Sequence, residues 1–133
     1  MRAFPLEIVT PDGLEFSGQA ESLLVHTSDG DVELLASHAD FLGSLGIGRA
    51  RIIVDGKSRL ASVAGGFISA KNGRVKVVAT TFEFADDIDL ERAEAAKSKA
   101  EEIIRASKDA REYTLAEARL KRALNRINVK TMK

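Results

Sequence analysis

The sequence predicts a β + α fold, in which an N-terminal antiparallel β-sandwich is followed by a C-terminal two-helix antiparallel hairpin. Up to Thr81, short apolar runs alternate with Pro, Gly, Asp and Asn turn signals, a pattern typical of antiparallel sandwiches and flattened barrels. From Ile88 onward Pro and Gly are absent, and apolar residues recur every three or four positions, which is the period of one helix face. The change of pattern near Asp86 and Asp87 therefore predicts two domains, residues 1–85 and residues 86–133.

Turn signals divide the first domain into strands. Pro11-Asp12-Gly13 and Ser28-Asp29-Gly30 each follow an apolar run. Asp55-Gly56 and Asn72-Gly73 lie between apolar runs and indicate hairpins, because both central residues of a type I′ turn need a positive φ. The expected strands are Phe4–Thr10, Ala20–Thr27, Ala50–Val54, Ser58–Ala64, Phe67–Ala70 and Arg74–Thr80.

The second domain contains two amphipathic segments. Asp86, Asp87 and Asp89 supply the negative charge that favours a helix start. The apolar face of the first helix is expected to consist of Leu90, Ala93, Ala96, Ala100, Ile103 and Ile104. After a short connection at residues 107–111, the second helix is expected to begin at Thr114, where Glu117 completes a capping box. Its expected apolar face is Ala116, Leu120, Ala123, Leu124 and Ile127.

The facing residues of this hairpin are largely alanine. Burying an alanine methyl contributes about 0.8 kcal/mol, against about 1.5–3 kcal/mol for a leucine or isoleucine side chain. Single helices of this length are marginal in water without a packing partner. The pattern therefore indicates either a movable element that opens when another surface competes for it, or a small stable tail.

Composition excludes several classes of function. Twenty basic and twenty acidic residues cancel, so no overall field favours nucleic acid or an anionic membrane. The absence of cysteine excludes disulfides, thiolate catalysis and cysteine-ligated zinc. No apolar run approaches the roughly 20 residues that span a bilayer, and MRAFPLEIVTPDG lacks the features of a secretion signal. We therefore expect a cytosolic chain whose only route to a membrane is through another protein.

Three further features could form sites. A basic stripe on the second helix consists of Arg119, Arg122, Arg126 and Lys130. Three interpretations of this stripe are open: a solvated helix face, a face that binds anions, or a contact with nucleic acid. The glycines of GSLGIG precede a strand rather than a helix, so they are expected to connect strands and not to bind a dinucleotide. His26 and His38 have no converging partners in the sequence and are expected to be structural or surface residues. The sequence contains no nucleophile–base arrangement that would indicate an enzyme.

Five segments in order resemble one family, the epsilon subunit of the bacterial F-type (rotary) ATP synthase. They are LEIVTPDGLEFSG, SDGDVELLASHADFL, AGGFISAKNGRV, DIDLERA and LKRALNRI. The resemblance extends over essentially the whole chain, in the expected order. DIDLERA matches the I-D-x-x-R-A signature of the nucleotide-binding members of that family. The resemblance is therefore to those members in particular.

The resemblance implies a non-catalytic rotor subunit on the cytoplasmic face of the bacterial cell membrane, held there through the complex. The β-sandwich would attach to the gamma subunit and the ring of c subunits and help couple proton transport to ATP synthesis. The helical hairpin would be regulatory: folded, it permits turnover, and extended toward the catalytic alpha and beta subunits, it inhibits ATP hydrolysis. No cofactor is required, but ATP would act as a regulatory ligand of the folded hairpin.

The resemblance also implies site residues. Those expected to bind nucleotide are Glu83, Ile88, Asp89, Arg92, Ala93, Lys99, Arg122 and Arg126. Arginine suits this role because its guanidinium group matches phosphate geometry. Asp31 and His38 are expected to contact the partner ring. The family usually has Gly-Ile-x-Pro-Gly-His where this chain reads Glu33-Leu34-Leu35-Ala36-Ser37-His38, which changes the backbone options of that loop.

The alternative to a rotor subunit is a stand-alone β-sandwich adaptor that binds an acidic protein partner through its basic C-terminal helix. A nucleic-acid-binding module is a weaker interpretation, because aromatic residues do not interleave with the basic stripe. Co-purification with gamma and catalytic subunits distinguishes the rotor subunit from the adaptor.

Overall fold

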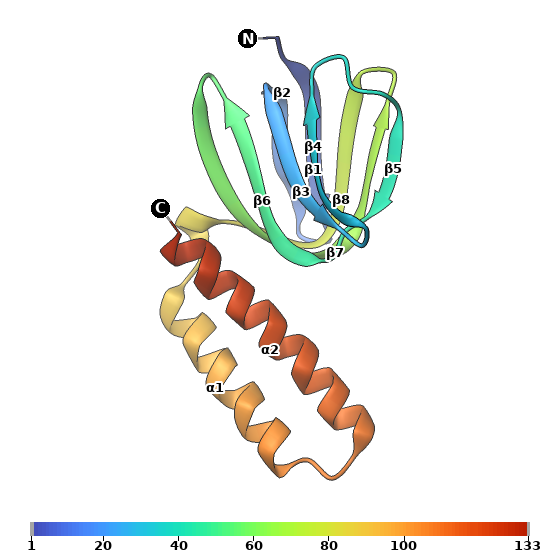
Figure 1. Cartoon of the computed structure of the whole chain (residues 1–133). Helices are drawn as coiled ribbons and strands as arrows, with labels where there is room; N and C mark the ends of the chain where they lie inside the picture. The colour runs from blue at the N-terminus through green and yellow to red at the C-terminus, as the bar shows by residue number, and fades with distance from the viewer. Residues whose placement is uncertain (1, 133) are drawn as a thin grey trace. The chain divides into compact units, whose positions relative to one another are not determined.

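The computed structural model describes residues 2–132 and divides the chain into two compact units, one ending at Phe84 and the other beginning at Ala85 (Figure 1). The strands of the first unit are β1 (Phe4–Thr10), β2 (Gly13–Ala20), β3 (Ser22–Thr27), β4 (Gly30–Leu35), β5 (Phe41–Ser44), β6 (Ile47–Val54), β7 (Lys57–Lys71) and β8 (Arg74–Phe84). The second unit contains a 3₁₀ turn, η1 (Ala85–Asp87), and the helices α1 (Leu90–Ala106) and α2 (Ala110–Thr131).

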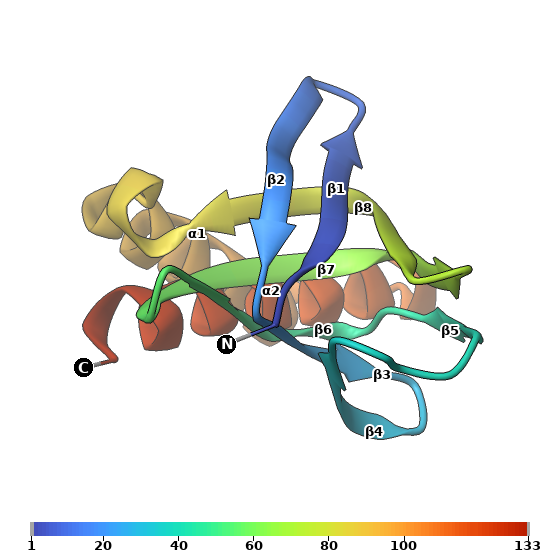
Figure 2. The same ribbon diagram turned by 90° about the horizontal axis from the view of Figure 1, so that it is seen from above.

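The strands form one hydrogen-bonded sheet in the order β2-β1-β8-β7-β6-β3-β4, and β5 pairs with β7. The sheet folds over itself, so that the β1–β2 pair and the β3–β4 pair lie on opposite sides of the sandwich (Figures 1 and 2). Ile8, Leu23, Ile52, Ile68 and Val77 are fully buried between the layers. The first unit therefore has a hydrophobic core of its own.

The predicted β-sandwich followed by a helical hairpin is confirmed, with one difference in strand direction. Among the strand pairs of residues 2–132, β1 and β8 run parallel, whereas the other pairs are antiparallel. A parallel pair needs a long connection between its strands, and here the connection is nearly the whole unit. The sequence pattern shows neighbouring hairpins and carries no sign of a pairing between the first and last strands.

Two predicted strands are one strand in the structure. Ser58–Ala64 and Phe67–Ala70 both belong to β7, which continues through Gly65 and Gly66 at φ values of 75° and 110°. Positive φ is open to glycine without steric cost, so the strand passes through this pair without ending. The strands β2, β4 and β5 lie outside the predicted set, and β2 is exposed along most of its length, so its apolar pattern is weak.

The second helix begins earlier than predicted. Asp109 is its N-cap, with the carboxylate accepting a hydrogen bond from the Arg111 backbone N–H at 3.0 Å, and α2 starts at Ala110 rather than Thr114. The prediction was wrong because Asp109 provides an N-cap five residues upstream of Thr114, where the proposed capping box begins. Thr114 instead lies inside the helix, where its hydroxyl donates to the Ala110 carbonyl at 2.9 Å.

The contact between α1 and α2 is an alanine seam. Its buried members are Ala93 and Ala100 of α1 and Ala116 and Ala123 of α2. Of the predicted face of the second helix, Ala116 and Ala123 are buried and Leu120 and Ile127 are half-buried, whereas Leu124 is 38% exposed. At the open end of the hairpin the Lys130 ammonium donates to the Ala85 carbonyl at 3.0 Å, which ties the last turn of α2 to η1.

Gly66 provides a test of the sheet. A methyl group at this position would collide with the carbonyl oxygen of Val78 on β8, in a backbone conformation that L-residues rarely adopt. We expect Gly66→Ala to lower the free energy of unfolding by at least about 4 kcal/mol, in the range of severe steric disruptions. Urea unfolding followed by circular dichroism measures this change.

Gly73 is the matched control. It also has a positive φ, of 77°, but a methyl group there meets nothing within 4 Å. Gly73→Ala should therefore cost only the backbone strain of about 1–2 kcal/mol. Equal losses in the two variants would contradict the assignment of the Gly66 effect to its contact with β8.

Candidate functional site

A groove of about 400 Å³ lies between the two helices of the second unit. Its lining consists of Ala96, Lys99, Ala100, Ile103, Arg119, Arg122, Ala123 and Arg126. Four of these side chains are cationic, and none of the described lining residues is acidic. The groove thus combines a floor of small apolar residues with positive charge from both helices.

Helix geometry explains why these cations meet. Arg119, Arg122 and Arg126 are separated by three and four residues, so they share one face of α2. The alanines at 96, 100 and 123 have short side chains, which leave the space that the groove occupies. Lys99 projects from α1 into the same space, so the two helices contribute to a single anion-attracting surface.

The structure brings together three of the residues that the resemblance implies for nucleotide binding. Lys99, Arg122 and Arg126 all line the groove, and Arg119 joins them. The sequence had placed Arg119 in the basic stripe but not among the nucleotide-binding residues. Lys130, the fourth member of the stripe, is engaged with the Ala85 carbonyl instead.

Four other implied residues lie at the start of α1, outside the groove lining. Ile88 and Ala93 are buried, with 3% and 0% of their surface exposed. Asp89 is the N-cap of α1, and its carboxylate accepts a hydrogen bond from the Arg92 backbone N–H at 3.2 Å. The Arg92 side chain is exposed.

The remaining implied residue, Glu83, belongs to the first unit. It lies near the end of β8, opposite Ser62 of β7, and is half-buried.

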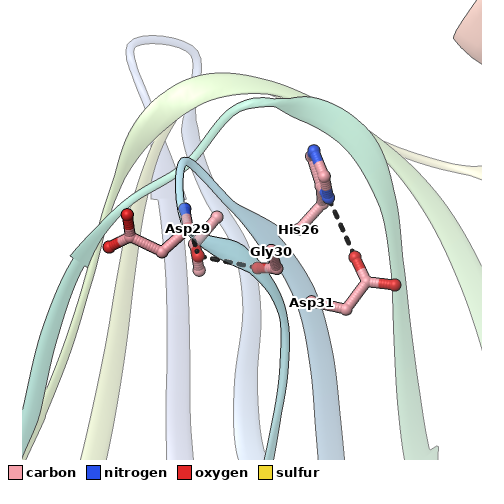
Figure 3. A network of polar contacts seen from close by, with 5 residues as sticks. His26, Asp29, Gly30 and Asp31 are labelled. Carbon is pink, nitrogen blue, oxygen red and sulfur yellow. Dashed lines mark hydrogen bonds and ion pairs between the residues drawn. The ribbon is translucent and has the colours of Figure 1, made fainter.

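On the first unit, Asp31 forms a polar pair at the tip of the β3–β4 hairpin. Its carboxylate accepts a hydrogen bond from His26 Nδ1 at 2.8 Å (Figure 3). The turn itself is held by the Thr27 hydroxyl, which donates to the Gly30 carbonyl at 2.7 Å. Asp29 points away from the His26–Asp31 pair in Figure 3.

His38 lies beyond the opposite end of β4. Its Nδ1 donates to the Leu35 carbonyl at 2.9 Å, and its ring meets Phe4 edge-on, with the two ring centres 5.5 Å apart. Asp31 and His38, both expected to contact a partner, therefore do not form one cluster. They mark the two ends of the same strand.

The altered loop keeps the backbone shape that a glycine would provide. Ser37, at the position where the family usually has the second glycine, adopts a φ of 68°. At the position of the first glycine, the Glu33 carboxylate accepts a hydrogen bond from the Arg51 guanidinium at 2.7 Å. Glu33 and Arg51 are both register partners of Leu24, so their side chains meet over that residue.

The GSLGIG segment connects strands, as expected. Gly43 lies in β5 and Gly48 in β6. A methyl group at Gly48 would come within 2.6 Å of the His26 Cβ, so glycine is needed for β6 to pass close to that side chain. The segment contributes to the His26–Asp31 pair by leaving room for it.

The outer face of the sandwich carries an exposed apolar row that the sequence analysis did not identify. The sheet register places Leu14 opposite Val9, Val9 beside Val78, and Val78 opposite Phe67. Leu14 is 61% exposed and Phe67 is 49% exposed. Val9 and Val78, which lie between them, are half-buried. A row of exposed and half-buried apolar side chains across four strands is typical of a protein–protein contact.

Two kinds of site are absent from the described part of the chain. Residues 2–132 contain no group of three or more His, Cys, Asp or Glu side chains that could hold a metal ion. None of the helices in this range is long and apolar enough to cross a membrane.

Comparison with known proteins gives matches to both parts of the chain. Residues 3–85 match the family model described as ATP synthase, Delta/Epsilon chain, beta-sandwich domain. Residues 86–131 match the model described as ATP synthase, Delta/Epsilon chain, long alpha-helix domain. The two models meet one residue after the division between the two compact units.

Curated relatives match over essentially their full length. The chain is 37% identical over 134 residues to the ATP synthase epsilon chain of Ruminococcus albus, covering 100% of both chains. It is 37% identical over 129 residues to the epsilon chain of Bacillus velezensis, covering 97% of this chain and 98% of that protein.

Solved structures show the same fold at lower identity. A chain of the Euglena gracilis mitochondrial ATP synthase, solved as OSCP/F1/c-ring, matches with a TM-score of 0.79 and 20% identity, over 90% of this chain and 76% of that chain. A chain of the Tetrahymena thermophila central stalk/c-ring structure matches with a TM-score of 0.63 and 12% identity, over 96% of both chains. From its sequence and both family models, the protein belongs to the epsilon chain family of ATP synthase.

Proposed function

We propose that this chain is a non-catalytic subunit of the central stalk of a proton-translocating bacterial ATP synthase. The β unit attaches it to the gamma subunit and the c-ring, and the helical unit regulates ATP hydrolysis with ATP as its ligand. Membership of the epsilon chain family supports the first part. The observation that carries the second part is the groove of four cations between α1 and α2.

The apolar row is the surface proposed to pack on the gamma subunit. Its side chains Leu14, Val9, Val78 and Phe67 lie in register on adjoining strands, so they offer a continuous apolar strip to a partner. Leu42, which is 75% exposed, adds apolar surface on β5, which pairs with β7. Burying such side chains is the main favourable term in protein association.

The two ends of β4 are the proposed contacts with the c-ring. Asp31 and His38 hold defined positions there, through His26 and through the Leu35 carbonyl respectively. Through these contacts the protein is placed at the cytoplasmic face of the bacterial cell membrane as a peripheral part of the complex.

The proposed regulatory ligand is ATP, bound in the groove of the folded hairpin. Lys99, Arg122 and Arg126 would neutralise the phosphates, and arginine adds bidentate hydrogen bonds to phosphate oxygens. Because the helices meet mainly through alanines, little apolar burial holds them together. A ligand that contacts both helices therefore stabilises the folded state, and without it the hairpin can extend toward the catalytic alpha and beta subunits and inhibit them.

The gamma contact is tested by placing a charge in the apolar row. Phe67→Asp should weaken binding to isolated gamma subunit by about tenfold or more, because aromatic residues at the centre of an interface commonly contribute at least about 2 kcal/mol. Leu35→Asp is the control, since Leu35 is 46% exposed but lies on β4, outside the row. Equal effects of the two substitutions in a binding assay would rule out the row as the contact surface.

The ATP site is tested by titration calorimetry on the full chain. We expect ATP to bind, and Arg122→Ala or Arg126→Ala to weaken binding by about tenfold or more, since each removes charge-assisted hydrogen bonds. Arg92→Ala measures the contribution of the signature residues outside the groove. Lys121→Ala removes an exposed cation of the same helix that does not line the groove, and should leave affinity nearly unchanged.

No heat of binding at millimolar ATP would contradict the ATP site for this protein. Equal losses in the Arg122, Arg126 and Lys121 variants would show that only net charge matters and that the groove is not the site.

The regulatory role is tested by removing residues 88–133. The described core of the β unit lies entirely before residue 85, so the truncated chain should remain folded and should still join the complex. ATP hydrolysis by the reconstituted enzyme should then lose the inhibition that the full chain exerts. If inhibition is unchanged in the truncated complex, the hairpin is not the inhibitory element.

A further inference from the structure

A second pocket, of about 380 Å³, opens on the β unit where β1, β2, β7 and β8 adjoin. Three cations line it, namely Lys71, Arg74 and Lys76. Glu7 is the only acidic side chain of its described lining. The pocket therefore carries a net positive charge.

The pocket lies on the same face of the sheet as the apolar row. Side chains two residues apart on a strand share one face, and Glu7 and Lys76 precede Val9 and Val78 by two residues. Lys76 in turn lies opposite Ser69 of β7. Two residues of a strand span about 7 Å, so a partner that packs on the apolar row reaches the edge of the pocket.

Two of the cations have no counter-charge in the free chain. Lys76 forms an exposed ion pair with Glu7 at 3.6 Å. The Lys71 and Arg74 side chains are exposed, and within residues 2–132 neither makes a hydrogen bond or an ion pair. The carboxylate of Asp40 accepts a hydrogen bond from the backbone N–H that follows Lys71, at 3.2 Å, and pairs with neither cation.

The two unpaired cations also repel each other. Lys71 and Arg74 are register partners across the β7–β8 hairpin. Like charges directly opposite each other on neighbouring strands destabilise a sheet. An anion between the two side chains would turn this repulsion into attraction, so the pair favours a partner that supplies negative charge.

A partner that covers the apolar row must compensate these charges. Taking a cation out of water is unfavourable unless a group of opposite charge pairs with it. A carboxylate at this point would accept charge-assisted hydrogen bonds from Lys71 and Arg74. The hydroxyls of Ser17 and Ser69, which also line the pocket, can donate to the same oxygens.

We propose that the pocket is the polar rim of the gamma contact and receives an acidic side chain of the gamma subunit, with Lys71 and Arg74 as its direct partners. This rests on the proposed contact between the apolar row and gamma, and it assigns the charged part of that surface. Protein interfaces commonly have a polar rim beside an apolar centre. A charge pair on one side of the row also fixes the orientation of the partner, which apolar contacts alone do poorly.

The first test measures binding of the full chain to isolated gamma subunit at several salt concentrations. Lys71→Ala and Arg74→Ala should each weaken binding by about tenfold or more and reduce its dependence on salt, because each removes a charge-assisted contact. Lys57→Ala is the control. Lys57 is an exposed cation at the opposite end of β7, outside the pocket lining, so affinity and salt dependence should stay unchanged.

The same variants show whether lost binding reflects lost folding. Because Lys71 and Arg74 repel each other in the free chain, replacing either should leave the urea midpoint of unfolding unchanged or raise it. A lower midpoint would contradict the repulsion on which the assignment depends.

The second test identifies the counter-charge. A carbodiimide joins an ammonium group to a carboxylate in contact with it, forming an amide bond with loss of water. In the complex with gamma, Lys71 should become linked to an aspartate or glutamate of the gamma subunit, as mass spectrometry of the digested product would show. Lys57 should form no such link.

Three results overturn the assignment. If Phe67→Asp weakens gamma binding but Lys71→Ala and Arg74→Ala do not, the gamma contact stands and the pocket lies outside it. If the two alanine variants lose binding to vesicles of anionic phospholipid and keep binding to gamma, the pocket takes a lipid headgroup. If the wild-type chain does not bind gamma, the proposed contact fails and the role of the pocket fails with it.

Discussion

The parallel pairing of β1 with β8 is the constraint on which the β unit depends. It joins the β1–β2 hairpin to the β7–β8 hairpin and so makes one sheet of what would otherwise be separate pieces. The same pairing sets the register that aligns Val9 with Val78 and completes the apolar row. A slip of one residue in this pair would turn the side chains of one hairpin to the other face, since successive strand residues point in opposite directions. The register of this pair thus determines both which side chains enter the core and which form the proposed gamma contact.

The helical unit follows a different physical rule. Alanine at the seam allows α1 and α2 to approach closely, but each contact buries little apolar area. Cations from both helices can consequently lie close together above the alanines of the groove. The apolar burial that holds the two helices together remains small. A fully paired sheet and a hairpin that meets mainly through alanines support the proposal that the β unit attaches and the helical unit moves.

Sequence patterns predicted the elements with strong local signals and failed where long-range contacts decide. Phe4–Thr10 was predicted to the residue, because it is apolar and ends at a Pro-Asp-Gly turn. The merging of two predicted strands into β7 was not foreseen, since the bend at Gly65 and Gly66 depends on the neighbouring strand as well as on glycine itself. The start of α2 was misplaced because two acceptable caps, Asp109 and Thr114, compete within five residues.

In the candidate site, too, local patterns were predictive and long-range contacts were not. Spacing on one helix predicted the common face of Arg119, Arg122 and Arg126, but not which of them share a groove with Lys99, which depends on how the two helices pack. The apolar row was invisible in the sequence, because its members come from four strands whose register no local pattern reveals.

The groove also has a consequence for the hairpin when it is empty. Like charges three or four residues apart destabilise a helix by about 0.2–0.5 kcal/mol per pair, and Arg119, Arg122 and Arg126 form two such pairs, with Lys99 facing them. Repulsion between these cations therefore opposes the folded hairpin when no anion is bound. Dissolved salt reduces this repulsion by screening. An anion that fills the groove removes the repulsion and adds attraction at the same point. In the proposed switch, the positive charge of the groove would favour the extended hairpin when no anion is bound, and a bound anion would favour the folded one.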